Sequence, residues 1–300
     1  MGIKVQNISK SYGQLKALKD VSFEVKPGEL FGLIGPDGAG KTTLFSILTT
    51  LLFADTGTAR VAQYDVVNSY KEIRNSIGYM PGRFSLYQDL TVEENLNFFA
   101  TIFGTTIEEN YELIKDIYVQ IEPFKDRRAG KLSGGMKQKL ALSCALIHKP
   151  KVLFLDEPTT GVDPVSRKEF WEMLKRLQKK GITILVSTPY MDEAGLCDRI
   201  ALIQEGTILK IDTPKALVNH FPKKLYNIKA HNMYQLIRAL NTYEHRYSVF
   251  PFGEFVHYTD IRDDFKMEIL KTYLEQQGLQ SIQIELTKPT IEDTFMELAR

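Results

Sequence analysis

The segment Gly35-Pro36-Asp37-Gly38-Ala39-Gly40-Lys41-Thr42 decides the fold of this chain. It matches the phosphate-binding pattern G-x-x-x-x-G-K-[ST], in which glycines let backbone N–H groups curl around phosphates. The apolar run 30–34 precedes it and a helical pattern begins near Gly40, which is the strand, loop and helix context that the motif requires. The sequence therefore predicts a nucleotide site, with Lys41 on the β- and γ-phosphates and the Thr42 hydroxyl on Mg²⁺.

Three further apolar runs lie at 152–155, 182–186 and 199–203, and each is short and almost free of polar residues. Strands have this composition when helices cover both faces of a parallel sheet. Between the first two runs, residues 164–180 carry apolar side chains at helical spacing and stop at Gly181, which predicts a βαβ unit. The chain is therefore expected to adopt an α/β fold with a mostly parallel core sheet.

Two segments depart from the parallel pattern. Residues 21–25 alternate apolar and polar side chains and end at Pro27-Gly28, which predicts a strand of an antiparallel edge sheet. Thr91 and Glu94 match a capping box at the start of a helix. Residues from about 83 to 150 have helical patterns throughout, so we expect a helical subdomain inserted into the α/β core.

The pattern changes after Thr213-Pro214. From there the apolar periodicities follow the order βαββαβα, with a hairpin at 247–260 that we expect to be broken at 251–253. This is the order of a small ferredoxin-like α+β unit. We therefore expect two domains, residues 1–215 and an accessory domain over residues 216–300.

Two more segments carry chemistry. Residues 152–157 are an apolar strand that ends in two carboxylates, of which Asp156 is placed to hold Mg²⁺ through water and Glu157 to polarise an attacking water. The segment Ser133-Gly134-Gly135 precedes an amphipathic helix and offers backbone N–H groups to an anion. Alone, the first is typical of a solvated loop and the second of a linker, but their combination with the phosphate-binding segment favours function.

Composition excludes several classes of protein. Lys+Arg 38 against Asp+Glu 37 leaves a net charge of +1, so no global basic field holds nucleic acid or an anionic membrane. The most apolar stretch, residues 44–54, is about half the ~20 residues of a membrane helix, and the first residues match no targeting segment. Cys144 and Cys197 give no disulfide framework and fit a reducing cytosol. Any membrane role is therefore expected to be peripheral, through partners.

At the three motifs together the sequence resembles the nucleotide-binding subunit of an ATP-binding-cassette (ABC) transporter, over residues 1 to about 215. The resemblance implies ATP and Mg²⁺ as cofactors, Glu157 as catalytic base, and Thr42 and Asp156 on the metal. It places Tyr12 against the adenine ring, with a surface aromatic beside a turn as the alternative. The nucleotide-binding residues that it implies are Tyr12, Gly35, Pro36, Asp37, Gly38, Ala39, Gly40, Lys41, Thr42, Thr43, Ser133, Gly134 and Gly135.

The resemblance also implies a dimer, because in this family each ATP lies between the phosphate loop of one subunit and the signature Ser-Gly-Gly of the other. Residues 161–164 match the family's loop across that interface, and segments 128–139 and 289–295 are similar to ATPases of ABC-2 type exporters. Within that group the chain resembles the degenerate member of a pair of two non-identical ATPase subunits. The implied partners are ABC-2 type permease subunits and a second, non-identical cassette ATPase, at the cytoplasmic face of the plasma (inner) membrane, with no nucleic acid.

Two positions depart from the family pattern. Gly82 stands where the family has a glutamine that reaches the metal and the attacking water, and Pro189 stands where it has a histidine on the γ-phosphate. Neither residue offers a side-chain donor. Gln88 and His148 are poor substitutes, because catalytic geometry tolerates little displacement, and we expect His148 on the surface of a helix.

Three functions stay open at this point. The first is an ATP-hydrolysing subunit that drives a separate exporter permease, which the intact Glu157 favours. The second is a nucleotide-gated clamp that hydrolyses little ATP itself and supplies its signature to an active partner, which Gly82 and Pro189 favour. The third is a cassette ATPase acting on DNA or ribosomes, although the sequence has no long heptad insertion, no second cassette and no basic run.

Overall fold

The computed structural model describes residues 2–300, which divide into two compact units. The first contains the residues up to Lys215 together with Phe295–Arg300, and the second is Ala216–Thr294. From the sequence, all of residues 216–300 were expected in the second. Within the described chain, no helix combines the length and the apolar character needed to cross a membrane.

The first unit contains most of the regular structure, and α7 (Pro214–Asn219) and α10 (Ile291–Leu298) lie where the chain passes between units. Its strands are β1 (Ile3–Tyr12), β2 (Leu15–Val25), β3 (Leu30–Ile34), β4 (Thr56–Val61), β5 (Tyr64–Asp65), β6 (Ile77–Met80), β7 (Val152–Asp156), β8 (Thr183–Thr188), β9 (Arg199–Gln204) and β10 (Thr207–Asp212). Its helices are α1 (Lys41–Leu48), α2 (Tyr70–Ser76), α3 (Val92–Ile102), α4 (Ile107–Tyr118), α5 (Gly134–Leu146) and α6 (Pro164–Lys179).

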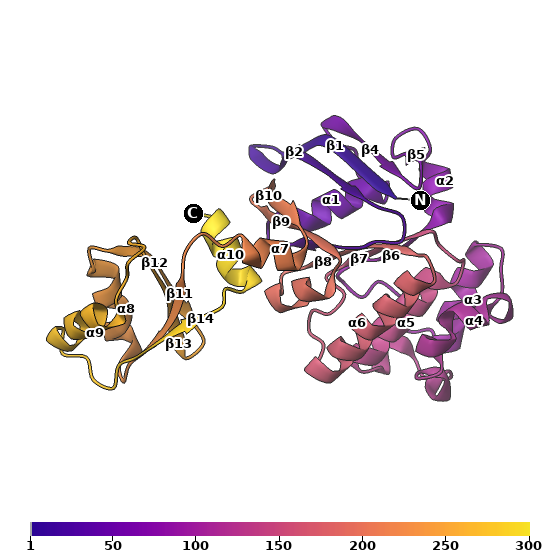
Figure 1. Ribbon diagram of the computed structural model, residues 1–300. Helices are drawn as coiled ribbons and strands as arrows, with labels where there is room; N and C mark the ends of the chain where they lie inside the picture. The colour runs from indigo at the N-terminus through magenta and orange to yellow at the C-terminus, as the bar shows by residue number, and fades with distance from the viewer. Residues whose placement is uncertain (1) are drawn as a thin grey trace. The chain divides into compact units, whose positions relative to one another are not determined.

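A six-stranded sheet in the order β10-β9-β3-β8-β7-β6 forms the centre of the first unit (Figure 1). All neighbours are parallel except β10 on β9. Every residue of β3, β7 and β8 is buried, as expected for strands covered on both faces. The predicted parallel core is confirmed, and it brings the carboxyl ends of these three strands to one edge, where ligand sites form in such sheets.

An antiparallel sheet in the order β2-β1-β4-β5 covers α1 (Figure 1). Leu44, Phe45 and Leu48 of α1 belong to one hydrophobic core that includes residues of this sheet and of the parallel sheet. The predicted edge strand at 21–25 is confirmed as the end of the longer β2. Helix α1 is therefore fixed between two sheets, which holds the loop before it in place.

Helices α3, α4 and α5 form the helical segment between β6 and β7 (Figure 1). The predicted capping box is present, because Thr91 Oγ1 accepts from Glu94 N at 3.1 Å and the Glu94 carboxylate accepts from Thr91 N at 2.7 Å. Such a cap contributes about 1 kcal/mol. The regular helices of this segment begin at Val92, later than the predicted residue 83.

The second unit is an antiparallel sheet in the order β12-β13-β11-β14 with two helices packed on it. Leu236 of the first helix and Leu270 of the second share a core with Val256 and Tyr258. The elements are β11 (Leu225–Lys229), α8 (Met233–Thr242), β12 (Arg246–Phe252), β13 (Phe255–Asp260), α9 (Met267–Gln276) and β14 (Gln283–Thr287).

The predicted hairpin at 247–260 is confirmed, but its turn begins two residues later than the predicted break at 251–253. Strand β12 continues through Pro251 to Phe252, and the turn consists of Gly253 and Glu254. Strand β12 is at the edge of the sheet, where a proline without an N–H group is tolerated. Gly253 has a φ of 58°, a backbone conformation that favours glycine in a turn.

We expect a fragment of residues 216–294 to unfold cooperatively on its own, because its core side chains all come from within the fragment. Urea denaturation of the purified fragment, followed by far-UV circular dichroism, measures this. A gradual change of signal without a sigmoidal transition would show that the fragment depends on the rest of the chain.

Candidate nucleotide-binding site

The phosphate loop connects β3 to α1. A Cβ at Gly35 would lie 2.1 Å from the carbonyl oxygen of Ile203, and one at Gly40 would lie 2.4 Å from that of Ala17. Gly38 and Gly40 have φ values of 78° and 100°, which favour glycine. The glycines of the motif are therefore required by the path of the loop over the start of α1.

Lys41 lies at the base of the loop and is 3% exposed. Its ammonium group is 2.8 Å from Gly35 O, 2.9 Å from Pro36 O and 3.0 Å from Glu157 Oε1. An ammonium has three donors, so the chain itself satisfies all of them. A phosphate that enters the loop must compete with Glu157 for this group.

Strand β7 brings Asp156 and Glu157 to the same edge of the sheet. Asp156 is 2% exposed, and its Oδ1 accepts from Ser187 Oγ at 2.5 Å. Glu157 has a φ of 49°, and its N–H donates to both the carbonyl and the hydroxyl oxygen of Ser187, each at 3.1 Å. Ser187 therefore holds both acidic residues in position.

Ser187 was not predicted as a site residue. The signal that was available is its position, directly after the apolar run 182–186 at the carboxyl end of a parallel strand, where ligand sites form.

Asp156 and Thr42 offer the oxygen donors that Mg²⁺ prefers. Within residues 2–300, Asp156 Oδ2 has no hydrogen-bond partner, and Thr42 is exposed at the first turn of α1. Mg²⁺ typically takes one or two protein oxygens and keeps waters and phosphate oxygens as its other ligands, so these two residues fit it. Burial and the charge of Asp156 raise the pKa of the adjacent Tyr79 to about 12, which keeps that phenol neutral beside the carboxylate.

A hollow of about 430 Å³ is lined by six of the thirteen predicted nucleotide-binding residues and by Glu157. Its volume lies within the range of small-molecule sites, about 300–1,000 Å³. Tyr12 is 49% exposed at the end of β1, so its ring is open to a flat ligand. The hollow is lined by Tyr12, Gly38, Gly40, Lys41, Thr42, Thr43 and Glu157, and by residues that were not predicted, Leu15, Lys16, Ala17, Lys19 and Glu205.

The predicted signature lies outside this hollow, at the start of α5. Ser133 caps the helix, with its Oγ accepting from Met136 N at 3.3 Å, and Gly134 and Gly135 form the first turn. A Cβ at Gly135 would lie 2.8 Å from Ser166 Oγ near the start of α6. The structure therefore does not bring the signature and the phosphate loop together within one chain.

Both positions that depart from the family pattern border the site. A Cβ at Gly82 would lie 3.1 Å from Asp156 O and 3.8 Å from Glu157 Cβ. Pro189 follows Thr188, whose carbonyl accepts from Gly35 N at 3.3 Å. Neither residue has a side-chain hydrogen-bond donor. The site therefore lacks a donor at position 82, beside the acidic residues, and at position 189, beside the phosphate loop.

Gln88 and His148, the two possible substitutes for the groups missing at positions 82 and 189, lie away from the hollow. The carbonyl of Gln88 accepts from Gly130 N at 2.9 Å, and Gln88 does not line the hollow. The prediction that His148 lies on a helix surface is wrong: it follows the end of α5, is half-buried, and stacks on Phe103 with ring centroids 3.8 Å apart. Its Nε2 lies 2.8 Å from Ile77 O, and burial lowers its pKa, which favours the neutral ring.

Glu193 is a second residue that sequence reasoning missed. It is 2% exposed and accepts from Thr159 Oγ1 at 2.7 Å and from Thr188 Oγ1 at 2.6 Å. Thr159 follows Glu157 by two positions and Thr188 precedes Pro189. Glu193 therefore ties the loop after the acidic strand to the end of β8.

A glycine-rich phosphate loop between β3 and α1, with an acidic strand end beside it, defines a nucleotide-binding α/β domain. A family model described as ABC transporter matches residues 18–160. The Nod factor export ATP-binding protein I of Rhizobium sp. (strain N33) is 34% identical over 303 residues, which cover 99% of this chain and 97% of that protein. The chain belongs to the family of ABC transporter ATP-binding proteins, the ABC ATPases.

Other similar proteins match the first part of the chain. The probable multidrug ABC transporter ATP-binding protein YbhF of Escherichia coli (strain K12) is 42% identical over 217 residues, 72% of this chain, and the match spans only 38% of the length of YbhF. The dimeric structure of MJ0796, a bacterial ABC transporter cassette, is 26% identical with a TM-score of 0.64 and covers 70% of this chain and 98% of that one. The expected cassette fold is thus confirmed.

Proposed function

We propose that this chain is the ATP-binding and ATP-hydrolysing subunit of a membrane exporter. The observation that carries the proposal is the hollow in which Tyr12, Lys41 and Glu157 meet. A second solved structure, of MJ0796 in a post-hydrolysis state bound to ADP and Pi, has the same TM-score of 0.64 to this chain. The relatives named for multidrug transport and Nod factor export support export as the direction.

In this proposal each residue of the hollow has one task. The adenine ring stacks on Tyr12, and the N–H groups of the phosphate loop and Lys41 bind the β- and γ-phosphates. Thr42 and Asp156 would hold Mg²⁺, which would neutralise charge on the phosphates. Glu157 leaves Lys41 when the phosphates arrive and orients the attacking water, while Ser187 keeps its backbone in place.

The chain's own site turns over slowly in this account, because positions 82 and 189 lack the groups that would contact the water and the γ-phosphate. Its signature lies outside its own hollow and serves the ATP of a second, non-identical cassette. The dimeric MJ0796 structure supports pairing of two cassettes. Should hydrolysis at the chain's own site be negligible, the same geometry makes it a nucleotide-gated clamp that activates its partner.

The partners in this proposal are ABC-2 type permease subunits at the cytoplasmic face of the inner membrane. Leu51 supports a docking site there, because it is 62% exposed and lines a hollow of about 380 Å³. Phe103 and His148 line the same hollow. Exposed apolar groups of this kind mark protein interfaces. The strand order of the second unit supports its classification as a ferredoxin-like accessory domain.

A calorimetric titration of the purified chain with Mg-ATP tests the proposal. We expect saturable binding of one nucleotide per chain, because the hollow and Lys41 are complete within one chain. No saturable heat with Mg-ATP would contradict the function.

A further inference from the structure

A hollow of about 480 Å³ lies entirely within the second unit. Two segments enclose it: residues 221–226, which lead into β11, and residues 260–265, which follow β13. They meet because the two strands pair, with Leu225 opposite Thr259. None of these residues takes part in the nucleotide site.

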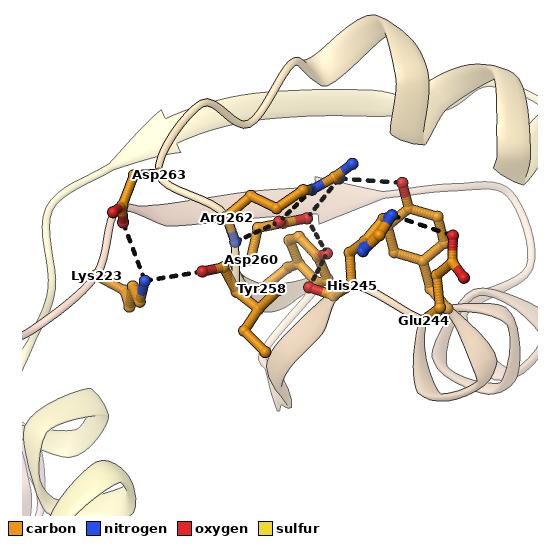
Figure 2. Close-up of polar contacts among 9 residues, drawn as sticks. Lys223, Glu244, His245, Tyr258, Asp260, Arg262 and Asp263 are labelled. Atoms are coloured by element: carbon orange, nitrogen blue, oxygen red, sulfur yellow. Dashed lines mark hydrogen bonds and ion pairs between the residues drawn. The ribbon is translucent and has the colours of Figure 1, made fainter.

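The buried acidic residue in this hollow, Asp260, already has hydrogen-bond partners for both carboxylate oxygens. Its side chain is 1% exposed. Arg262 donates to Oδ1 from its backbone N at 2.9 Å and from Nε at 2.8 Å, while Arg262 Nη2 at 3.0 Å and the Tyr258 hydroxyl at 2.6 Å donate to Oδ2 (Figure 2). These bonds fill the acceptor sites of a carboxylate, so Asp260 fixes the guanidinium group of Arg262.

Arg262 keeps donors for a ligand. Its Nη2 also donates to the Tyr243 hydroxyl at 3.2 Å, but over residues 2–300 its Nη1 has no partner. A guanidinium held in a fixed plane binds carboxylate or phosphate groups with little loss of side-chain freedom.

Two lysines add positive charge. Lys223 donates to Ile261 O and to Asp263 Oδ1, each at 3.0 Å, but the Asp263 side chain is 97% exposed (Figure 2). An exposed ion pair contributes little, so an incoming anion can replace Asp263. Lys224 is exposed, and no interaction partner is found for it in the described part of the chain. Three cations against Asp260 and Asp263 leave the hollow with one net positive charge.

The aromatic wall contains a hydroxyl without a partner. Tyr226 is 6% exposed and lines the hollow, with its ring centroid 4.5 Å from that of Phe265. No hydrogen bond to its hydroxyl is found among residues 2–300, and burial and the charge of Asp260 raise its pKa, so the group remains a donor. The hydroxyl is not sealed from solvent, so it can donate to a ligand oxygen in the hollow.

We propose that this hollow binds a small organic anion, whose carboxylate or phosphate group is held by Arg262, Lys224 and Tyr226 and whose flat apolar part packs on Phe265. The volume of about 480 Å³ is that of a small-molecule site rather than of an isolated phosphate. The accessory unit would then sense a small molecule, independently of the nucleotide site.

Titration of the full chain with phenyl phosphate, followed by residue-resolved NMR, tests the proposal. We expect saturable shifts of the amide signals of residues 221–226 and 260–265, which are distinct from those of the phosphate loop. Benzyl alcohol has the same ring without the charge and should bind at least about ten-fold more weakly. A parallel titration with benzoate ranks the two head groups, and a tighter fit of either one agrees with the proposal.

Matched variants separate the site from its surroundings. Lys224→Ala and Tyr226→Phe should each weaken phenyl phosphate binding about three- to ten-fold. Lys271→Ala and Tyr234→Phe, which alter exposed residues of α9 and α8, should leave it unchanged. Lys224→Ala remains decisive if Tyr226→Phe does not fold, because Lys224 is exposed. The proposal would be overturned if phenyl phosphate caused no shifts or if all four variants bound it with equal affinity. It would also be overturned if benzyl alcohol bound as tightly as phenyl phosphate.

Discussion

Gly135→Asp should nearly abolish ATP turnover by a complex of this chain with an intact partner cassette, whereas Glu157→Gln in this chain should barely change it. In the proposed pair, the signature of this chain contacts the partner's ATP, so a carboxylate at position 135 places negative charge against its phosphates. Removing a donor from a transition-state charge costs about 2.7–4 kcal/mol, roughly 100- to 1,000-fold in rate. Glu157 acts only at this chain's own, slow site, so its loss changes little of the total ATP turnover of the complex.

The control for this comparison is nucleotide binding by the variant chain alone. Gly135 does not line the hollow, so Gly135→Asp should bind Mg-ATP as the unaltered chain does. The Cβ added at position 135 would lie 2.8 Å from Ser166 Oγ. The melting temperatures of the variant and the unaltered chain are therefore compared as well. The opposite ranking of the two variants would indicate a homodimer in which Glu157 performs the hydrolysis.

Lys41→Ala should lower the affinity for Mg-ATP about ten- to a hundred-fold. A charge-assisted contact to phosphate in a sheltered site contributes about 1.5–3 kcal/mol, and Lys41 is 3% exposed. Glu157→Gln is a matched control, because it removes the ion pair with Lys41 but keeps the ammonium group. That variant should bind Mg-ATP at least as tightly as the unaltered chain in the same calorimetric titration. Unchanged affinity after Lys41→Ala would contradict the role of this residue.

The sequence predicted the parallel core because its strands are continuous apolar runs, of which 30–34 became β3 without change. Strand β1 was not predicted. Its residues do not alternate cleanly, and its pairing with β2 is interrupted by register shifts between Val5 and Ile8 and again up to Ser11. Periodicity is a weak signal where the register of a strand changes.

The site was predictable where a motif is local. The phosphate loop is one contiguous segment and Asp156-Glu157 is another. The structure places both segments at one edge of the sheet. The contact of Ser187 with Asp156 was not predictable from the sequence, because it spans 31 positions and exists only because β7 and β8 are adjacent. His148 was misplaced for the same reason, as its stacking on Phe103 joins the ends of two helices that are far apart in sequence.

The central claim is that this chain binds ATP but hydrolyses it slowly, because positions 82 and 189 carry no donor. Single-turnover hydrolysis of labelled ATP, compared between the unaltered chain and the double variant Gly82→Gln/Pro189→His, tests it most directly. A Cβ at position 82 would lie 3.1 Å from Asp156 O, close to the site, so the backbone there must give by a few tenths of an ångström. The account predicts that the double variant hydrolyses ATP at least about ten-fold faster with similar affinity, since one restored donor contributes more than 1.4 kcal/mol to the transition state. Equal rates for the two chains would contradict the claim.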